Sequence, residues 1–555
     1  MNPRSGLPQP NPYDLLAALG VVALLGGFFL ASKEAVGPYQ AVPIDLDPQR
    51  LPGYALRTGF RMGLALVLSF LFTLVYAPLA AKTRWEPFLV ALLDILQSVP
   101  ILGFLAASVG AFSALFPSKA LGYELAAIFA VFTSQAWNMT FSFYQSLKTI
   151  PRELDEAARL YRLGPLHRFL RLELPYALPG LVWNAMVSMS GGWFFVVASE
   201  AISVGRTEVD LPGIGSYLAR ALAQEDGRAM AWAVLAMFLT ILLYDQLLFR
   251  PLVVWSQRFK YEEEPGSYPA RSWVLDLLRR TRVTQGLARA WGEALLERAL
   301  RWGGLEGRGL PPIPWFPYAL LGLGGGLGLM ALSRLLLPLG PGEWALAFFL
   351  GFLTLLRVLG ILFLVSLLWV PVGVFLGLRP ALAVRVQALL QFLAAFPANL
   401  LYPLAAYLLL RHHLSLEVFS AFLMALGTQW YILFNVIAGA SALPEDLKEA
   451  ARLYGLRGLA LWRRLLLPGV FPFLVTGLIT ASGGTWNASV VAEVVHWGSH
   501  TLEAKGLGSY IAKATAAGDE GRLFLGILVM GLFVVSLNRL LWRRLYQLAE
   551  ERFRL

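Results

Sequence analysis

Long apolar runs constrain this sequence more than any other feature. Segments such as DLLAALGVVALLGGFFLAS from Asp14 and AWAVLAMFLTILLYDQLLF from Ala231 approach or reach the ~20 residues that a helix needs to cross a bilayer. They do not alternate apolar and polar residues over ~10 positions, as barrel strands would. The chain is 57% hydrophobic and only 15% charged, against roughly 25% in soluble domains. It is therefore predicted to be an all-α polytopic membrane protein.

The apolar runs form two sets of six, separated by a polar segment rich in arginine. The first run ends without a small-residue cleavage site, so we interpret it as a retained helix and not as a signal peptide. This pattern predicts a first six-helix unit at 1–256, a cytoplasmic linker at 257–312 and a second six-helix unit at 313–555. The predicted spans lie near residues 13–31, 56–80, 87–115, 121–147, 177–203 and 229–252, then 315–338, 345–376, 381–410, 415–440, 470–495 and 523–542.

The linker carries its own pattern. Tryptophan and leucine recur among arginines in a way that suits amphipathic helices on an anionic membrane surface. The linker is expected to act as a tether, and a regulatory role stays open.

The two sets are copies of one unit. Shifting the sequence by 293 residues superposes EAARLYRLGPLHRFLRLELP, which starts at Glu156, on EAARLYGLRGLALWRRLLLP, which starts at Glu449. Because each copy holds an even number of spans, the repeats should be parallel and related by a pseudo-twofold axis along the membrane normal.

Lysine and arginine gather in alternate loops of the predicted topology. Both copies of the repeated polar stretch are rich in them, as are the linker and the short turn with Lys82 and Arg84. Short cytoplasmic loops carry such an excess. These segments and both termini are therefore expected on the cytoplasmic side of a plasma (inner) membrane. The net charge of +11 is interpreted as this topology signal, and the expected surroundings are the lipid bilayer, with no nucleic acid.

Each repeated polar stretch is predicted to be a cytoplasmic helix-turn-helix between the fourth and fifth spans of its copy. Pro151 and Pro444 suit a first helical position, and the carboxylates that follow them complement the helix dipole. The helix is expected to break at Gly164 in the first copy and at Gly455 or Gly458 in the second. A simple anchor of positive charge would need neither this spacing nor its repetition.

The motif of EAA, three residues, Gly, nine residues, Ile or Leu, one residue and Leu-Pro resembles a known loop. It is the EAA loop in membrane subunits of bacterial ATP-binding-cassette (ABC) importers that use an extracellular solute-binding protein. The second copy matches it in full, whereas the first has Arg162 where the family has glycine, with Gly164 two residues later. The run LPGLVWNAMVSMSGGWFFVVASEAI, followed by GIGSYL, is similar to nitrate, sulfonate and taurine type permeases. The chain thus resembles a fused, two-copy permease subunit.

This resemblance implies the type I ABC importer transmembrane fold, with the two loops as coupling helices in grooves of ATP-binding subunits. One fused chain would bind two copies of an ABC ATP-binding subunit, together with an extracytoplasmic solute-binding protein. The residues implied in coupling are Glu156, Ala157, Ala158, Arg159, Gly164, Glu449, Ala450, Ala451, Arg452 and Gly455.

The sequence contains no GxxxxGK[ST] phosphate loop, so nucleotide binding by that means is not expected. The chain is predicted to be a transport subunit and not an enzyme. It would hold no cofactor of its own, while ATP and Mg bind the partner ATPase. It has no cysteine, and its five histidines lack metal-ligand spacing, so no metal site and no catalytic residue are predicted.

Polar side chains inside spans are costly and are therefore candidates for the solute path. Glu200 and Glu493 recur in both copies, each with a tryptophan seven residues earlier on nearly the same helical face. Alternatively, these glutamates lie at the outer end of the span, solvated or paired with arginines such as Arg57, Arg61 or Arg357, and stabilise a closed gate. The predicted path residues are Trp193, Glu200, Trp486, Asn487, Glu493 and Ser190.

Further polar residues lie on the third and fourth spans, where they could bind a polar solute or join helices by hydrogen bonds. They are Asp94, Gln97, Gln387, Gln391, Gln135, Asn138, Gln429 and Asn435.

The resemblance suggests a small oxyanion such as nitrate, bicarbonate or a sulfonate as the solute. Unpaired glutamates near the path would repel an anion, so a cation or a zwitterion stays open. The alternative function is a self-sufficient secondary transporter that couples to protons or sodium through Asp94, Glu200 or Glu493. A membrane enzyme is not favoured, because no repeated metal cluster and no GxSxG elbow occur.

Overall fold

The computed structural model describes residues 44–98, 101–116, 120–204, 207–259, 272–281, 333–498 and 500–553, with short pieces at 11–15, 18, 286, 326 and 330. The predicted spans at 13–31 and 315–338 lie mostly outside these residues, as does most of the predicted linker. The first copy below means residues up to 256, and the second copy means residues from 313.

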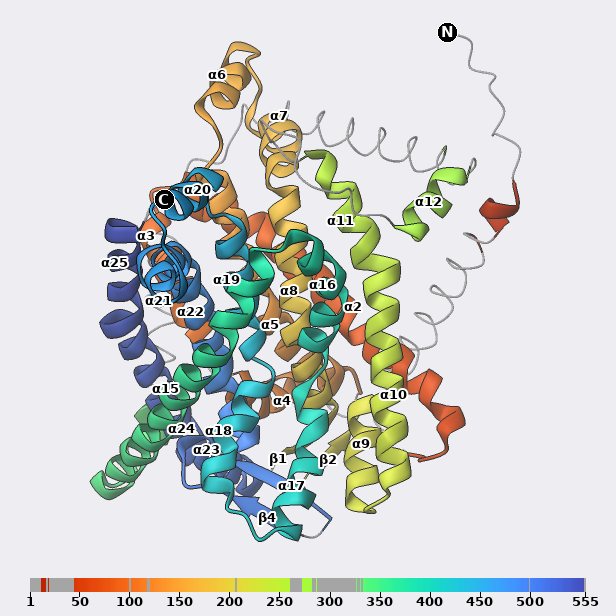
Figure 1. The fold of residues 1–555 in the computed structure, drawn as a ribbon. Helices are drawn as coiled ribbons and strands as arrows, with labels where there is room; N and C mark the ends of the chain where they lie inside the picture. The colour runs from red at the N-terminus through yellow and green to blue at the C-terminus, as the bar shows by residue number, and fades with distance from the viewer. Residues whose placement is uncertain are drawn as a thin grey trace.

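Helices make up most of the described chain (Figure 1). Six helical segments are long and apolar enough to cross a bilayer, or eight if two bent pairs each count as a span. The long helices of the first copy are α2 (Leu51–Lys82), α3 (Glu86–Ser98), α4 (Ile101–Leu115), α5 (Ala120–Lys148), α8 (Leu174–Glu200) and α10 (Gly227–Tyr244). Those of the second copy are α15 (Pro341–Gly377), α16 (Pro380–Ala395), α17 (Tyr402–Arg411), α18 (Leu416–Leu426), α19 (Gln429–Ser441), α22 (Leu467–Ala492) and α24 (Glu520–Leu537).

Shorter helices join these spans. They are α6 (Arg152–Leu160), α7 (Pro165–Arg168), α9 (Ile214–Ala223), α11 (Arg250–Ser256), α12 (Trp273–Arg280), α20 (Glu445–Leu453), α21 (Gly458–Leu461), α23 (Leu507–Ala517) and α25 (Arg543–Phe553).

Several predicted spans are bent. The predicted span at 381–410 is broken by 78° near residue 397, and that at 415–440 bends by 47° between α18 and α19. Helix α5 stays continuous over 29 residues, which is roughly 43 Å at 1.5 Å per residue. Apart from these bends, and from 201–203 and 494–495, which lie in strands, the predicted spans within the described residues coincide with helices. The all-α class is confirmed.

The repeat extends to irregular backbone. Five-residue π-helical turns, Phe169–Glu173 and Trp462–Leu466, lead into α8 and α22. Another pair, Asp245–Phe249 and Asn538–Trp542, follows α10 and α24. Both pairs are related by the same shift of 293 residues, so the two copies share one backbone design.

Two antiparallel hairpins were not predicted. Strands β1 (Ala201–Val204) and β2 (Thr207–Asp210) follow α8, and β3 (Val494–Trp497) and β4 (His500–Glu503) follow α22. The structure thus has two ends: the loop end, which carries α6 and α20, and the hairpin end, which carries the strands (Figure 1). Strands of four residues are too short to show a period of two in the sequence.

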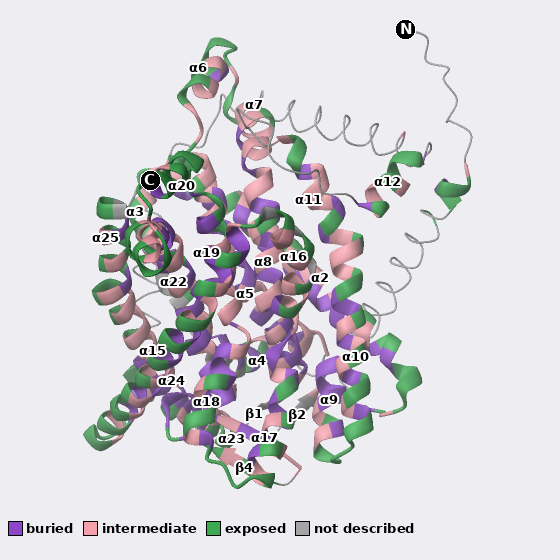
Figure 2. Ribbon diagram, in the orientation of Figure 1, coloured by how far each residue is buried: buried purple, intermediate pink, exposed green. Residues whose placement is uncertain are grey.

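Buried residues lie in the interior of each copy and where the copies meet, whereas large apolar side chains stay exposed along outer helices such as α2 and α15 (Figure 2). Exposed residues such as Leu71, Val75 and Phe363 suit contact with lipid. Inside, Ile101 and Leu105 of α4 belong to the same core as second-copy residues of α22. Each copy therefore contributes to a shared interior.

Candidate coupling loops and transport cavity

The two EAA stretches form the same structure at the loop end. Helices α6 and α20 each end in a turn whose backbone N–H bonds back into the helix. Leu163 donates to the Ala158 carbonyl (3.1 Å), and Leu456 donates to the Ala451 carbonyl (2.9 Å). This pattern closes a helix through one left-handed residue.

The left-handed residue of the first loop is Arg162, with φ 49°, and its counterpart in the second loop is Gly455, with φ 63°. Gly164, where the first helix was predicted to break, lies in the break between α6 and α7 with φ −63°, but it is not the left-handed residue. A side chain in the left-handed region costs roughly 1–2 kcal/mol. The first loop therefore keeps the turn of the second without the glycine that favours it.

Both loops present the same surface. Ala158 and Ala451 are each 5% exposed, and each lies in the helix just before its turn. A Leu-Tyr pair at the tip of each loop is 80–88% exposed: Leu160 and Tyr161 in the first, Leu453 and Tyr454 in the second. Of the other predicted coupling residues, the exposed ones are Glu156, Arg159, Gly164, Glu449, Arg452 and Gly455, and the partly buried ones are Ala157 and Ala450.

A chain of ion pairs anchors the first loop. Asp155 on α6 pairs with Arg159 (2.8 Å) and with Arg168 of α7 (2.6 Å). Arg168 also pairs with Glu173 (2.9 Å), whose side chain is 1% exposed and also pairs with Lys82 at the end of α2. The first loop is thus tied to two transmembrane helices by charge.

The second loop lacks this chain. The shift of 293 residues places Lys448, Leu461 and Leu466 at the positions of Asp155, Arg168 and Glu173. Leu466 is buried, and Leu461 packs against the same apolar core. Lys448 instead donates to its helix neighbour Glu445 (2.8 Å), and this bond lowers the pKa of Glu445.

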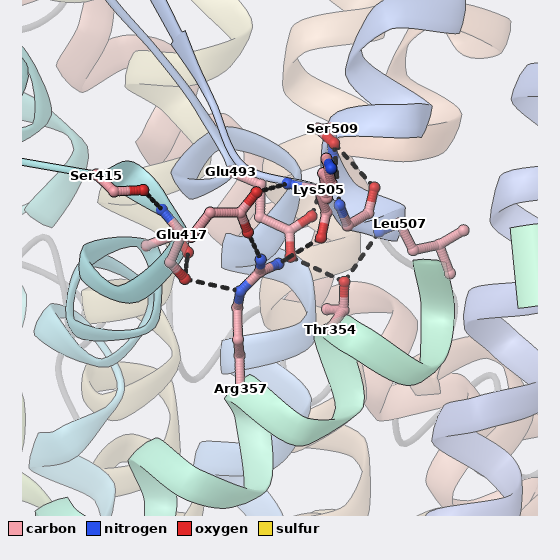
Figure 3. Close-up of polar contacts among 10 residues, drawn as sticks. Thr354, Arg357, Ser415, Glu417, Glu493, Lys505, Leu507 and Ser509 are labelled. Carbon is pink, nitrogen blue, oxygen red and sulfur yellow. Dashed lines mark hydrogen bonds and ion pairs between the residues drawn. The ribbon is translucent and has the colours of Figure 1, made fainter. Parts of the chain in front are cut away.

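At the hairpin end of the second copy, one arginine lies between two glutamates (Figure 3). Arg357 pairs with Glu493 (2.9 Å) and with Glu417, and it also donates to the Lys505 carbonyl (3.0 Å). Glu493 is fully buried, and Thr354 donates to the same carboxylate (2.8 Å). The buried carboxylate of Glu493 is therefore neutralised by the guanidinium of Arg357 and also accepts a hydrogen bond from Thr354.

The first copy builds the same cluster. Arg61 forks onto Glu124 (2.6 and 2.7 Å) and pairs with Glu200 (2.7 Å). Arg61 is 1% exposed and Glu200 is 0% exposed. Such bidentate pairs are the stronger kind of charged hydrogen bond.

Each buried glutamate also accepts a backbone hydrogen bond from the first turn of the helix that follows its hairpin. The backbone N–H of Gly215 donates to Glu200 (2.7 Å), and that of Ser509 donates to Glu493 (3.1 Å). A Cβ at Gly213 would lie 2.2 Å from the carboxyl group of Glu200. The GIGSYL motif thus leaves room for a carboxylate at a helix N-terminus, where negative charge is favourable.

Glu200 and Glu493 therefore occur in the paired arrangement that the sequence left open as an alternative. Sequence reasoning missed their partners Glu124 and Glu417. The shift of 293 residues relates these two acidic residues as well, so a search for repeated acidic residues would have found them.

A cavity of about 1190 Å³ lies between the two copies. Helices α3, α5, α8 and α10 of the first copy and α16, α19 and α22 of the second contribute to its lining. Its polar lining includes Asn138, Ser142, Asn184, Ser190, Tyr431 and Asn435, and its charged lining includes Glu86, Asp245, Arg539 and Arg543. Across the described part of the chain, no three His, Asp or Glu side chains gather as a metal site would require.

The predicted path residues divide between two places. Ser190 and Trp193 line the cavity, whereas Glu200, Glu493 and Trp486 do not. The Trp486 ring stacks on Phe533 of α24 at 6.0 Å between ring centroids. Asn487 also lies outside the lining. That Glu200, Glu493, Trp486 and Asn487 contact the solute stays a prediction.

Asn487, also predicted for the path, joins the two copies. Its side-chain oxygen accepts a hydrogen bond from the backbone of Ile101 (2.6 Å) at the start of α4. In the opposite direction, the side chain of Asn399 donates to the carbonyl of Phe194 on α8 (3.1 Å). The third span of each copy thus contacts the fifth span of the other.

The other polar residues on the third and fourth spans also differ in place. Asn138, Asn435, Gln97 and Gln391 line the cavity. Gln429 accepts a hydrogen bond from the indole of Trp369 (2.8 Å) and so joins α19 to α15. Gln135 is buried beside Met62, and the side chains of Asp94 and Gln387 lie outside the described residues.

Comparison with known proteins places these features in a family. The sequence model of the family described as "Binding-protein-dependent transport system inner membrane component" matches residues 65–250 and 324–555. The chain is 29% identical to the nitrate import permease protein NrtB of Leptolyngbya laminosa over 173 residues, which cover 31% of this chain and 58% of that protein. It is 26% identical to the bicarbonate transport system permease protein CmpB of Synechococcus elongatus over 174 residues, which cover 31% and 59%.

A shorter match has a higher sequence identity. Over 79 residues, or 14% of this chain and 30% of the relative, it is 38% identical to a protein of Escherichia coli provisionally named the aliphatic sulfonates transport permease protein SsuC. The chain spans about six tenths of the length of the nitrate and bicarbonate relatives. With the matching domain present twice, on the two copies that the repeat defines, the chain belongs to the family of binding-protein-dependent transport system inner membrane components.

Proposed function

We propose that this chain is the permease subunit of an ATP-driven importer, in which α6 and α20 couple its two copies to two subunits of a separate ATPase. ATP and Mg would bind that ATPase. Both termini and the loop end would face the cytoplasm, and the hairpin end would face an extracytoplasmic solute-binding protein. The predicted division at 1–256, 257–312 and 313–555 belongs to the same proposal.

One observation carries the proposal. Two loops whose anchors differ nevertheless expose the same Leu-Tyr pair on the same left-handed turn. Large apolar side chains that stand 80–88% exposed at two equivalent sites are what a docking surface for two equal partners requires. Positive charge alone would not need these side chains.

The solute is proposed to be small and polar, since it would pass through the cavity between the copies. Relatives are named for nitrate, bicarbonate and aliphatic sulfonates. The proposed solute is therefore a small oxyanion of this kind, and these three are the first compounds to test.

The test is purification of the whole chain from its native membrane in mild detergent, with mass spectrometry of the proteins that remain bound. We expect an ATP-binding subunit at two copies per chain. A quadruple variant with aspartate at Leu160, Tyr161, Leu453 and Tyr454 should lose that subunit and keep its own fold, because these side chains are exposed. The matched control carries aspartate at Leu414 and Val418, which are exposed on the hairpin side of the second copy.

Two outcomes would overturn the proposal. One is that the quadruple variant retains the ATPase at full stoichiometry. The other is that uptake in proteoliposomes persists without the ATPase and collapses with the ion gradient, as a secondary transporter would behave.

A further inference from the structure

The outward face of α10 changes from leucine to polar residues toward the loop end. Leu243 and Leu247 are exposed one turn apart on α10 and the π-helical turn that follows it. The next exposed side chains along the chain are Arg250, Gln257 and Arg258. Because charged side chains are costly in hydrocarbon, the boundary between acyl chains and lipid headgroups is expected between Leu247 and Arg250.

Helix α12 lies on the headgroup side of this boundary. It packs against α11, which begins at Arg250, and it lies on the outer side of α11, away from α20 (Figure 1). The Ser272 hydroxyl caps its start by accepting a hydrogen bond from the Leu275 backbone (3.3 Å). The helix is therefore a defined element at the rim of the bundle, at the depth where headgroups are expected.

One side of α12 is apolar and the other is charged. At about 100° per residue, the apolar side holds Trp273, Val274, Leu275, Leu277 and Leu278, and the charged side holds Asp276, Arg279 and Arg280. Trp273 and Leu278 are exposed although they are apolar. Helices with tryptophan and leucine opposite arginine lie in the membrane interface, with the apolar side toward the acyl chains.

The segment at 11–15 contacts the charged side of α12. The side chain of Asn11 donates to the Arg280 carbonyl (2.7 Å), and the Arg280 guanidinium lies over the Tyr13 ring, 5.7 Å from its centroid. The exposed residues of the two segments form one surface, called the rim surface below: Tyr13, Leu15, Trp273, Leu278, Arg279 and Arg280.

Positive charge at the rim is not matched by carboxylates. Asp276 pairs with Arg279 at 3.9 Å, and both side chains are more than half exposed, so this contact contributes little. Within the described part of the chain, Arg258 and Arg280 form no ion pair with a carboxylate. Their guanidinium groups can therefore donate to phosphate oxygens, which arginine binds in a bidentate manner.

We propose that the rim surface binds anionic lipid headgroups. Trp273 and Leu278 lie in the interface, and Arg279 and Arg280 bind lipid phosphates. Charge complementarity with an anionic leaflet and continuity with the leucine face of α10 identify lipid as the occupant. The rim surface lies outside the coupling loops and the cavity lining, so its lipid binding does not rest on the proposed transport role.

The absence of cysteine from this chain allows a specific test. Leu278→Cys provides a single site for a nitroxide spin label on the full chain. Collisions of the label with oxygen and with a water-soluble nickel chelate are measured in nanodiscs of phosphatidylcholine, with and without phosphatidylglycerol. Reference labels at Leu243→Cys and Leu414→Cys report contact with acyl chains and with water, since both leucines are exposed, on α10 and on the hairpin side respectively.

With phosphatidylglycerol present, we expect the label at residue 278 to collide with oxygen and to be shielded from nickel. Without it, nickel collisions should rise by about fivefold or more, since one arginine near an anionic surface favours binding by about that factor. Arg279→Gln combined with Arg280→Gln should produce the same rise in the anionic nanodiscs. Replacing both arginines with lysine should keep the label shielded, because the charge is retained.

The matched control is Arg228→Gln combined with Arg411→Gln, which removes two exposed arginines at the hairpin end and should leave the label shielded. Equal shielding from nickel in both lipids would overturn the proposal, because the contact would not depend on headgroup charge. Free access of nickel in both lipids would also overturn it. Shielding from both nickel and oxygen would overturn it as well, because protein and not lipid would then cover the rim surface.

Discussion

At the hairpin end, both copies hold one arginine between two glutamates, whereas at the loop end a chain of ion pairs in the first copy is replaced by leucines in the second. The loop backbones are nevertheless alike, down to the left-handed residue at the tip. In a homodimer, one residue serves both subunits, so the two sites cannot differ. Fusion removes that constraint, and the anchor of the loop has changed while its exposed surface has not.

The difference shows which features are interchangeable. Glu173 and Leu466 occupy equivalent buried positions. Glu173 is paired with basic side chains, and Leu466 packs in an apolar core. A buried charge is tolerated when it is paired, and an apolar side chain of similar size can replace a whole pair at little net change. The hairpin end has kept its charges in both copies because the carboxylate there also binds a helix N-terminus.

The largest effect is expected at the shared charge clusters. Glu200→Gln and Glu493→Gln should each lower the free energy of unfolding by about 3 kcal/mol, because removing one partner of a buried pair leaves the other uncompensated. Thermal unfolding of the full chain in nanodiscs measures this loss. If only one of the two variants is destabilised, the hairpin ends have diverged as well.

A smaller effect is expected for Glu173→Gln, about 2 kcal/mol, since Lys82 and Arg168 lose their buried partner but are 40% and 32% exposed and can be hydrated. Hydrogen exchange of the α6 amides should quicken by roughly tenfold or more, while α20 serves as the internal control. Unchanged exchange in α6 would show that the ion pairs do not anchor the first loop.

Converting one anchor into the other should be almost neutral. The double variant Glu173→Leu with Arg168→Leu reproduces the leucines of the second copy. Lys82 also loses its partner but is 40% exposed and can be hydrated, and the added apolar contacts offset this loss, so we expect the variant to stay within about 1 kcal/mol of the native chain. The relevant comparison is with Glu173→Gln, measured by the same exchange experiment. If the double variant is worse than the single one, the two anchors are not interchangeable.

The smallest effect concerns the tip of the loop. Arg162→Gly relieves a left-handed conformation that costs roughly 1 kcal/mol, but the added freedom of glycine in the unfolded chain offsets about half of this gain. A net stabilisation of about 0.5 kcal/mol is expected, and Gly455→Arg should change the stability by a similar amount in the opposite direction. Equal Tm values for Arg162→Gly and the native chain, together with a large loss in Gly455→Arg, would mean that the two turns are strained to different degrees.

The features that occur in both copies could be predicted from the sequence. The positions of the spans within the described residues follow from the apolar runs. The two EAA helices and the relation of Glu200 to Glu493 follow from one shift of 293 residues. The left-handed turn at Arg162 could not be predicted, because a backbone hydrogen bond from Leu163 holds a residue type that does not favour this conformation. Tertiary contacts commonly override such preferences.

The cavity could not be predicted in the same way. Its shape depends on the spacing of helix pairs, which a single span does not reveal. Asn184 keeps α8 and α5 joined through a side chain, whereas Gly477 lets α22 lie directly on α19. The orientation of an amide group toward a carbonyl is likewise a property of the packed pair of helices.

The hydrogen bonds that join the copies have one further consequence. Both side chains that make them, Asn487 and Asn399, belong to the second copy, and the equivalent positions of the first copy hold Phe194 and Ala106. An assembly of two first copies would have neither bond. The peptide connection between the copies therefore fixes composition: every molecule is made with one partner of each kind, and no sorting between unlike subunits is needed after synthesis.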